Sequence, residues 1–294
     1  MRLYTVGGRS VVVSGRVLKI GRLEKEFYED VNVPHEFLQE VEKAAVWMDI
    51  FTFLHGSPAT EPKFDHIMQW DTVAAIRITS FEKWHRNDIP KQTRRALRKS
   101  TEMGVEVRPV QFNDDFIKGI MEIFNERPIR QGKPFWHYGK DFLTVKAEMS
   151  RDLERSRFLG AFCNGELIGF AKLICAESYA RAVQLISRIA HRPKYPNNAL
   201  IAKAVEMCAE RRIPYLVFGQ FEYGKVGSKT LMDFKVHNGF RKVLLPRYYV
   251  PLTEKGALSL RLGFQEGLVA PFPKLVLRAF LRMRATWYAR IAHG

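Results

Sequence analysis

A carboxylate and a phenol stand side by side in the last third of the chain, and this pairing suits proton transfer. Glu222 and Tyr223 follow the apolar run YLVFG at 215–219, which predicts a buried strand. Open α/β sheets place functional groups beyond the carboxyl ends of their strands. Glu222 can act there as a general base, and Tyr223 as an acid or a hydrogen-bond donor. The alternative is a pair of ordinary surface loop residues.

A second group of candidate residues is crowded into the segment 125–140, NERPIRQGKPFWHYGK. Long polar side chains beside aromatic rings suit the recognition of an acidic or sugar-like molecule. His137 can also accept a proton, because an imidazole titrates near neutral pH, although a single histidine is more often structural. The candidate binding residues are Arg127, Arg130, Gln131, Trp136 and Tyr138.

Two lysines near these residues, Lys225 and Lys235, can hold a phosphate or a carboxylate by charge, or can simply face solvent. Lys225 lies in GQFEYGKV at 219–226, which nearly spells a phosphate-binding P-loop. Val226 takes the place of the Ser or Thr that would hold Mg²⁺, so we do not expect nucleotide hydrolysis. The 8 histidines and 3 cysteines show no metal-ligand spacing, so we expect no metal either.

Alternating strands and helices must position these residues from Gly104 onward. Asn164-Gly165 between two apolar runs is a strong signal for a β-hairpin. The order of elements indicates a mixed α/β sheet with helices on both sides. The expected strands are 105–110, 158–163, 167–176, 181–190, 215–219 and 241–252, and the expected helices are 113–130, 140–154, 197–212 and 227–240.

The first third of the chain has a less regular pattern. Residues 10–20 and 72–80 have the β-branched character of strands. Residues 35–54 begin with helical periodicity and end like a strand. A helix is expected over 89–104, and five cations precede its first acid, Glu102. This helix is the densest basic feature of the first half.

The pattern divides the chain into an N-terminal α/β region, a main domain and a tail. The corresponding residues are 1–103, 104–254 and 255–294. Whether the first region forms a separate domain or extends the same sheet stays open. The tail combines cations with an apolar stripe at helical spacing. Its residues 271–294 can therefore lie on an anionic membrane surface or dock onto the protein itself.

The chain carries 47 Lys and Arg against 31 Asp and Glu, a formal charge of +16. Such a positive field favours polyanionic partners, namely nucleic acid, anionic lipid or a phosphorylated substrate. The alternative is a solvated basic surface with no specific partner. Sparse cysteines in apolar runs indicate a reducing compartment. With no signal-peptide pattern and no run of about 18 apolar residues, we expect a cytoplasmic protein, or one peripheral to the inner face of the membrane.

The element order after Gly104 resembles that of the GNAT acyltransferase fold over about 150 residues. Three phrases also resemble Fem-type peptidyltransferases and their GNAT-like relatives. They are TRRALRKSTEMGVEVRPV at 93–110, NERPIRQGKPFWHYGK at 125–140 and FKVHNGF at 234–240. Fem-type proteins have two related halves, so the resemblance allows the N-terminal region to be a shortened GNAT-like half.

The resemblance implies a bacterial N-acyltransferase that moves an acyl or aminoacyl group to an amine. The donor would be a thioester or a tRNA ester. The amine would belong to a small molecule or to a cell-envelope precursor. In the GNAT arrangement the segment 125–140 would form a wall of the acceptor site.

The resemblance also implies a donor site ahead of the helix expected at 197–212. GNAT enzymes hold the pyrophosphate of acetyl-CoA or another acyl-CoA in a loop of the form Q/R-x-x-G-x-G/A, where backbone N–H groups and the helix dipole attract phosphate. The matching stretch has Arg192 at the first position, but Tyr195 and Asn197 replace the small residues. This departure argues against ordinary acetyl-CoA binding and leaves aminoacyl-tRNA as an alternative donor. The candidate donor-binding residues are Arg192, Tyr195, Asn197, Asn198 and Lys225.

Two alternatives accompany this interpretation. Asn197 or Asn198 can act as a plain helix cap. The chain as a whole can also be a non-catalytic protein on a degenerate acyltransferase fold. It would then bind RNA or a membrane surface through the basic residues 91–99 and the tail.

Overall fold

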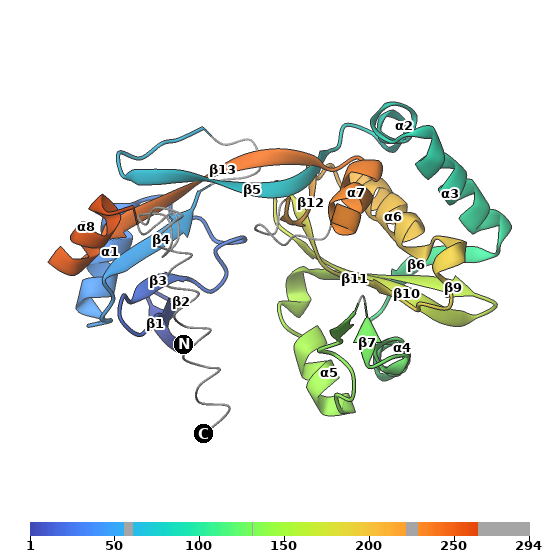
Figure 1. Ribbon diagram of the computed structural model, residues 1–294, viewed down its shortest axis with the longest axis horizontal. Helices are drawn as coiled ribbons and strands as arrows, with labels where there is room; N and C mark the ends of the chain where they lie inside the picture. Colours follow the sequence, from blue (N-terminus) through green and yellow to red (C-terminus); the bar gives the residue numbers. More distant parts are fainter. Residues whose placement is uncertain (56–60, 131, 222–228, 264–294) are drawn as a thin grey trace, which may run out of the picture. The chain divides into compact units, whose positions relative to one another are not determined.

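The computed structural model describes residues 1–55, 61–130, 132–221 and 229–263, and the chain folds into two compact units (Figure 1). The terminal unit combines 1–56 and 60–71 with the residues from Leu245 onward, and the central unit combines 57–59 with 72–244. Two strands, β5 (Ile67–Arg77) and β13 (Arg241–Pro251), contribute residues to both units. The mixed α/β class expected from the sequence is confirmed.

The terminal unit holds five neighbouring strands in the order β1, β2, β3, β4 and β13. The first three pair antiparallel, β3 and β4 pair parallel, and β4 pairs antiparallel with β13. A parallel pair needs a crossover, which α1 supplies. The remaining bounds are β1 (Arg2–Val6), β2 (Arg9–Ser14), β3 (Ile20–Leu23), α1 (Pro34–Lys43), β4 (Ile50–Leu54) and α8 (Glu254–Arg261).

The core of the terminal unit is a cluster of aromatic and branched side chains. Phe51, Phe53 and Tyr248 are fully buried, and Phe37 of α1 packs on Phe51 with 5.2 Å between ring centroids. The change from helical to strand-like character within 35–54 is confirmed, because α1 ends at Lys43 and β4 begins at Ile50.

The strands of the central unit lie in the order β5, β12, β11, β10, β9 and β6. β12 pairs parallel with β11 and antiparallel with β5, and the pairs from β11 to β6 are antiparallel. This sheet contains both parallel and antiparallel pairs, as expected. The bounds are β6 (Val105–Val110), β9 (Ser156–Cys163), β10 (Glu166–Cys175), β11 (Ala180–Ser187) and β12 (Tyr215–Gln220).

Helices cover both faces of this sheet (Figure 1). Side chains alternate between the faces of a strand, so Phe158 and Phe170 meet α4 and α5, while Leu159 and Ala171 meet α6 on the other face. The helices are α2 (Phe81–Lys83), the π-helical η1 (Trp84–Asp88), α3 (Lys91–Glu102), α4 (Asp114–Asn125), α5 (Phe142–Met149), η2 (Leu153–Arg155), η3 (Arg192–Lys194), α6 (Pro196–Glu210) and α7 (Lys229–His237). A short hairpin joins β7 (Ile129–Arg130) and β8 (Lys133–Pro134).

One local prediction from the sequence is confirmed, and one helix cap follows the usual residue preference. Asn164 and Gly165 both have positive φ, +53° and +79°. A two-residue type I′ turn requires this backbone, so β9 and β10 form the expected hairpin. The Asn113 side chain caps α4 by accepting a hydrogen bond of 2.9 Å from the Phe116 N–H.

The division of the chain differs from the one drawn on the sequence. The expected boundary between 103 and 104 falls inside the central unit. The reason is that α3 buries its small residues Thr93, Ala96 and Ser100, and the Thr93 hydroxyl donates 2.8 Å to the His237 carbonyl oxygen of α7. The expected amphipathic segment 271–294 lies outside the described residues. Within the described ranges, no helix has the length and apolar character needed to cross a membrane.

Candidate active site

The central sheet opens between the carboxyl ends of β11 and β12. The two strands pair at Ala180 with Leu216 and at Arg181 with Val217, and their pairing in the described structure stops there. Gly219, with φ of +60°, lies where the register between β12 and β5 shifts. Beyond this point the facing backbone edges of β11 and β12 do not bond to each other. A substrate can approach the strands where open α/β sheets bind their ligands.

A buried amine lies at the carboxyl end of β12. Lys235 of α7 is 0% exposed, and its Nζ donates to the Gln220 carbonyl oxygen at 2.5 Å. The same Nζ lies 5.1 Å from the centroid of the Phe218 ring. Burial lowers the pKa of the Lys235 amine to about 8. An ammonium group held in a dry setting can stabilise negative charge that develops on a reacting carbonyl oxygen. The sequence indicated only that Lys235 can bind an anion by its charge, because its burial depends on tertiary packing.

The N-terminus of α6 lies at the end of the loop that follows β11. After β11, the Arg188 N–H donates to the Ile168 carbonyl oxygen at 2.8 Å, and the N–H groups of Ile189 and Ala190 donate to the Glu126 carboxylate at 2.6 and 2.9 Å. The N–H groups of His191, Arg192, Lys194 and Tyr195 all donate to carbonyl oxygens within the loop. Pro193 and Pro196 have none to give.

Among the described residues, this leaves the N–H groups of Asn197 and Asn198 without a hydrogen-bond acceptor in the stretch 188–198. Neither asparagine caps α6, because the N-cap position belongs to Tyr195. Asn198 instead donates from Nδ2 to Asn238 Oδ1 at 3.0 Å. Two free N–H groups at a helix N-terminus can hold one phosphate group.

A groove of about 610 Å³ reaches this helix N-terminus from the side of α3 and α7. Tyr195 and Asn198 line it, together with Arg95 and Lys99 of α3. Phe234, the neighbour of Lys235, also lines it. Arg192 is exposed on the loop. Four expected donor-binding residues therefore lie at or just before the N-terminus of α6: Arg192, Tyr195, Asn197 and Asn198.

The segment 125–140 is held to the loop after β11 by Glu126 and Arg130, a half-buried ion pair. Burial disfavours the charged form of Glu126, but the N–H groups of Ala190 and Ile189 and the Arg130 charge outweigh it and lower the pKa of the carboxyl. Arg130 lies 3.3 Å from Glu126 and donates to the Ser187 carbonyl oxygen at 2.9 Å. Its guanidinium also lies over the Phe135 ring. Arg130, expected to bind the acceptor, instead links this segment to the end of β11.

His137 lies within an aromatic stack. Its ring lies 4.3 Å from Phe124, centroid to centroid, and its Nε2 accepts a hydrogen bond of 3.0 Å from Trp136 Nε1. Burial and the nearby Lys140 charge lower the pKa of His137 to about 4. The imidazole is therefore neutral at pH 7 and its basic nitrogen is already engaged, which favours a packing role over that of a base.

The other expected site residues divide into two groups. Arg127, Trp136 and Tyr138 are exposed on the segment 125–140, with Trp136 70% exposed, so they are available to a bound molecule. The residues Gln131, Glu222, Tyr223 and Lys225 lie outside the described residues. Within the described ranges, no group of three His, Cys, Asp or Glu side chains could hold a metal ion.

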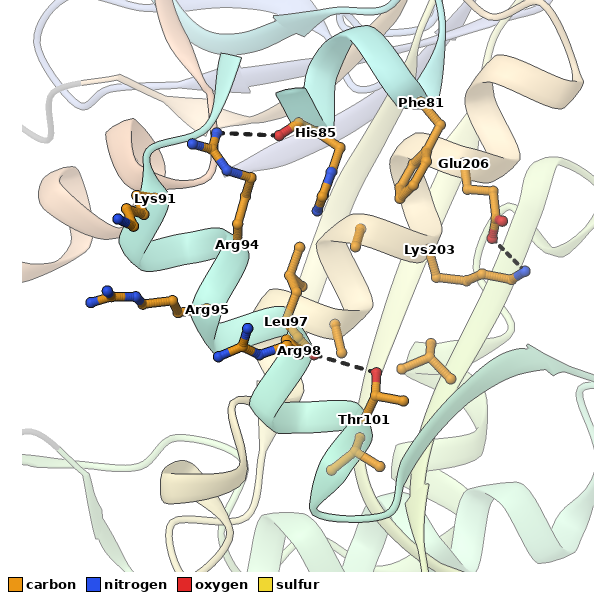
Figure 2. Close-up of a pocket in the computed structure, with 14 residues that line it drawn as sticks. Phe81, His85, Lys91, Arg94, Arg95, Leu97, Arg98, Thr101, Lys203 and Glu206 are labelled. Carbon is orange, nitrogen blue, oxygen red and sulfur yellow. Dashed lines mark hydrogen bonds and ion pairs between the residues drawn. The ribbon is translucent and has the colours of Figure 1, made fainter. Parts of the chain in front are cut away.

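A larger groove, of about 840 Å³, lies between α3 and α6 (Figure 2). Its floor is apolar, with Leu97, Val105 and Ala202 among the lining residues. Arg94 crosses its upper end and donates to the carbonyl oxygens of Ile89 at 2.6 Å and His85 at 3.4 Å. Arg94 therefore closes the C-terminal end of η1. The sequence analysis identified the basic helix but not this groove.

Sequence comparison identifies one family. A family model described as "Acetyltransferase (GNAT) domain" matches residues 87–235. These residues include the open end of the sheet, the N-terminus of α6 and Lys235. No curated protein matches the chain in sequence.

Solved structures with the same fold cover most of the chain. The structure of FemX has a TM-score of 0.58 at 10% identity, over 81% of this chain and 83% of FemX. L-PGS from Bacillus licheniformis has a TM-score of 0.53 at 11% identity, over 92% of this chain and 89% of that protein. A C-terminal domain (DUF2156) from Agrobacterium fabrum, described as that of a lysylphosphatidylglycerol synthetase, has a TM-score of 0.55 at 12% identity, over 88% and 86%. At these identities the likeness shows a shared fold.

Proposed function

Because the chain belongs to the acetyltransferase (GNAT) family, we propose that it transfers an acyl or aminoacyl group to an amine between the carboxyl ends of β11 and β12. The observation that carries this proposal is the buried Lys235 amine at the end of β12. The amine lies next to the stretch where β11 and β12 no longer pair. A buried ammonium group at this position can interact with the negative charge that develops on a reacting carbonyl oxygen.

The reaction requires four changes. The acceptor nitrogen forms a bond to the acyl carbon, the C–S or C–O bond to the donor breaks, a base takes the proton of the amine, and the leaving group gains a proton. Lys235 would stabilise the oxyanion of the tetrahedral intermediate. Glu222, two residues beyond Gln220 in the sequence, is the proposed base, and Tyr223 is the proposed donor to the leaving group.

The donor is proposed to be held by a phosphate group at the N-terminus of α6. Arg192, Tyr195, Asn197, Asn198 and Lys225 are the proposed contacts. The other N–H groups of the loop after β11 already donate to acceptors within the protein, so the loop offers little to a diphosphate. This supports an aminoacyl ester of tRNA over acetyl-CoA or another acyl-CoA, which stays the alternative donor.

The acceptor is proposed to be an amine on a small molecule or a bacterial cell-envelope precursor. The proposed contacts are Arg127, Gln131, Trp136 and Tyr138. Those that the structure describes are exposed on the segment that Glu126 holds to the loop after β11. We also propose a cytoplasmic location, with the segment 271–294 on the inner face of the membrane.

The test is a single-turnover assay with the full chain and two donors, acetyl-CoA and aminoacyl-tRNA, against a panel of primary amines. Calorimetric titration with acetyl-CoA runs beside it. The proposal predicts transfer to an amine from one donor, with weak or absent binding of acetyl-CoA. If neither donor transfers its acyl group to any amine, the assignment as a transferase is overturned.

A further inference from the structure

Three cations form an unpaired row along α3. Lys91, Arg95 and Lys99 are spaced four residues apart, so they follow one side of the helix with about 6 Å of rise between neighbours. All three are exposed. The other basic side chains of the region have partners: Arg94 donates to backbone carbonyls, Arg98 pairs with Glu102 at 3.3 Å, and Lys203 of α6 pairs with Glu206 at 2.6 Å. Within the described part of the chain, the three row residues have no acidic partner.

This row is unfavourable for the isolated helix. Like charges four residues apart repel one another on a helix surface. The first turn of α3 holds Lys91 and no acidic residue, so its charge opposes the helix dipole. A bound polyanion would relieve both effects, because its negative charges would lie between and beside the three cations.

The row lies beside a groove that can take a flat ring. Figure 2 shows Lys91 and Arg95 projecting to one side of α3, while Phe81 lies across the groove near α6. Phe81 stacks on His85 with centroids 5.9 Å apart and an interplanar angle of 17°. Both rings line the groove. Arg95 lines this groove and also the groove that reaches the N-terminus of α6. The cations and the aromatic pair thus belong to one continuous surface.

We propose that α3 and the groove between α3 and α6 bind a single-stranded nucleic acid, with phosphates on Lys91, Arg95 and Lys99 and a base against Phe81. Proteins that bind single strands combine a cationic track for the backbone with aromatic side chains on which bases stack. The inference rests on the proposed function in one respect, because a strand that follows the row ends at the proposed donor site. Binding of the strand itself does not depend on transfer.

The composition of α3 argues for a nucleic acid over a lipid surface. A helix that lies on a membrane inserts large apolar side chains beside its cations. The exposed positions of α3 carry only polar side chains, Thr93, Ala96 and Ser100 are buried, and Leu97 is half-buried against the protein. The surface therefore has charge for a polyanion but nothing that would enter the acyl layer.

Fluorescence anisotropy with a fluorescein-labelled single-stranded oligoribonucleotide tests the proposal. The wild-type chain should bind with an affinity that falls steeply with salt. The triple variant Lys91→Gln, Arg95→Gln, Lys99→Gln should lower the slope of log K against log salt by about 2, since each phosphate contact on a single strand contributes about 0.7. Phe81→Leu, which keeps an apolar side chain in the groove, should weaken binding about tenfold through lost stacking.

The matched control removes three exposed cations from the terminal unit, in Arg2→Gln, Arg16→Gln, Lys63→Gln. It has the same net charge as the row variant and should bind like the wild type. Equal loss in both triple variants would overturn the inference, and so would the absence of saturable binding at low salt. Binding to phosphatidylglycerol vesicles that requires the row, without binding to the oligonucleotide, would overturn it in favour of a membrane.

Circular dichroism confirms that each variant is folded before binding is measured. Lys235→Met separates this inference from the proposed function, since it should bind the oligonucleotide like the wild type even if transfer is lost. Row-dependent binding without any transfer would leave this inference standing and remove the proposed function.

Discussion

Two of the lysines that the structure describes in the central unit are buried, and their surroundings differ. Lys172 of β10 is 3% exposed and donates to the carbonyl oxygens of Met149 at 2.8 Å and Arg151 at 2.6 Å. Lys235 of α7 is 0% exposed and donates to the Gln220 carbonyl oxygen. Burial lowers the pKa of both amines. Burial and a lowered pKa therefore do not distinguish a structural lysine from a functional one.

Position distinguishes the two. Lys172 closes the C-terminal end of α5, where carbonyl oxygens need donors and the helix dipole favours a cation. Lys235 bonds to the last residue of β12, beside the edge at which β11 and β12 separate. One amine completes the hydrogen bonding of the fold, and the other lies where a substrate can approach. The predictions below test this difference.

The largest effect on stability is expected at Lys172. Lys172→Met leaves the Met149 carbonyl oxygen, on a residue that is 1% exposed, without its donor. The free energy of unfolding should fall by about 1–3 kcal/mol. At pH 10, where the lowered pKa no longer destabilises the folded chain appreciably, Lys235→Met should change it by less than about 1 kcal/mol, because Gln220 is exposed and water can replace the lost donor. Urea denaturation of both variants measures this, and equal losses would contradict the contrast.

The pH dependence of stability should single out Lys235. Its pKa is about 8 in the folded chain against an ordinary 10.5, so between these values the unfolded chain binds more protons. The free energy of unfolding should therefore rise with pH through this window, by up to about 3 kcal/mol. Lys235→Met should lack this rise. Denaturation of wild type and variant at pH 7.5 and 10 gives the difference, and parallel curves would show that the amine titrates normally.

The smallest effect is expected at His137. His137→Phe keeps an aromatic ring against Phe124 and removes the titratable nitrogens. Transfer at pH 7 should change less than about threefold, whereas loss of a catalytic base would cost about 100-fold or more. Single-turnover transfer rates of the wild type and the variant between pH 5 and 8 show whether His137 acts as a catalytic base. A loss of that size, with a changed pH profile, would restore His137 as the base.

The elements that the sequence predicted well depend on local signals. Asn164-Gly165 set the hairpin and Asn113 capped α4, because turn and cap preferences operate over two to four residues. The helix expected over 113–130 ends early, at Asn125, and a short β-hairpin begins at Ile129. Pro128 explains why the helical periodicity could not continue there.

The features that the sequence could not predict depend on distant contacts. Glu126 binds N–H groups 63 and 64 residues away, and its ion pair with Arg130 gives that arginine a structural contact that the sequence did not indicate. The burial of Lys235 requires α7 to pack beside the end of β12. The groove between α3 and α6 likewise exists only after both helices pack on the sheet. In the sequence, Lys235 stood out only for its charge, and the phrase FKVHNGF that contains it only for a family resemblance.

The transfer rates of Lys235→Met and Lys172→Met, measured side by side in single turnover at equal folded fractions, test the central claim most directly. If Lys235 stabilises the oxyanion, Lys235→Met should lose about 100-fold or more, as removal of one oxyanion donor does in other enzymes, while Lys172→Met stays within about threefold of the wild type. Equal rates in the two variants would contradict the assignment of the reaction centre to the end of β12.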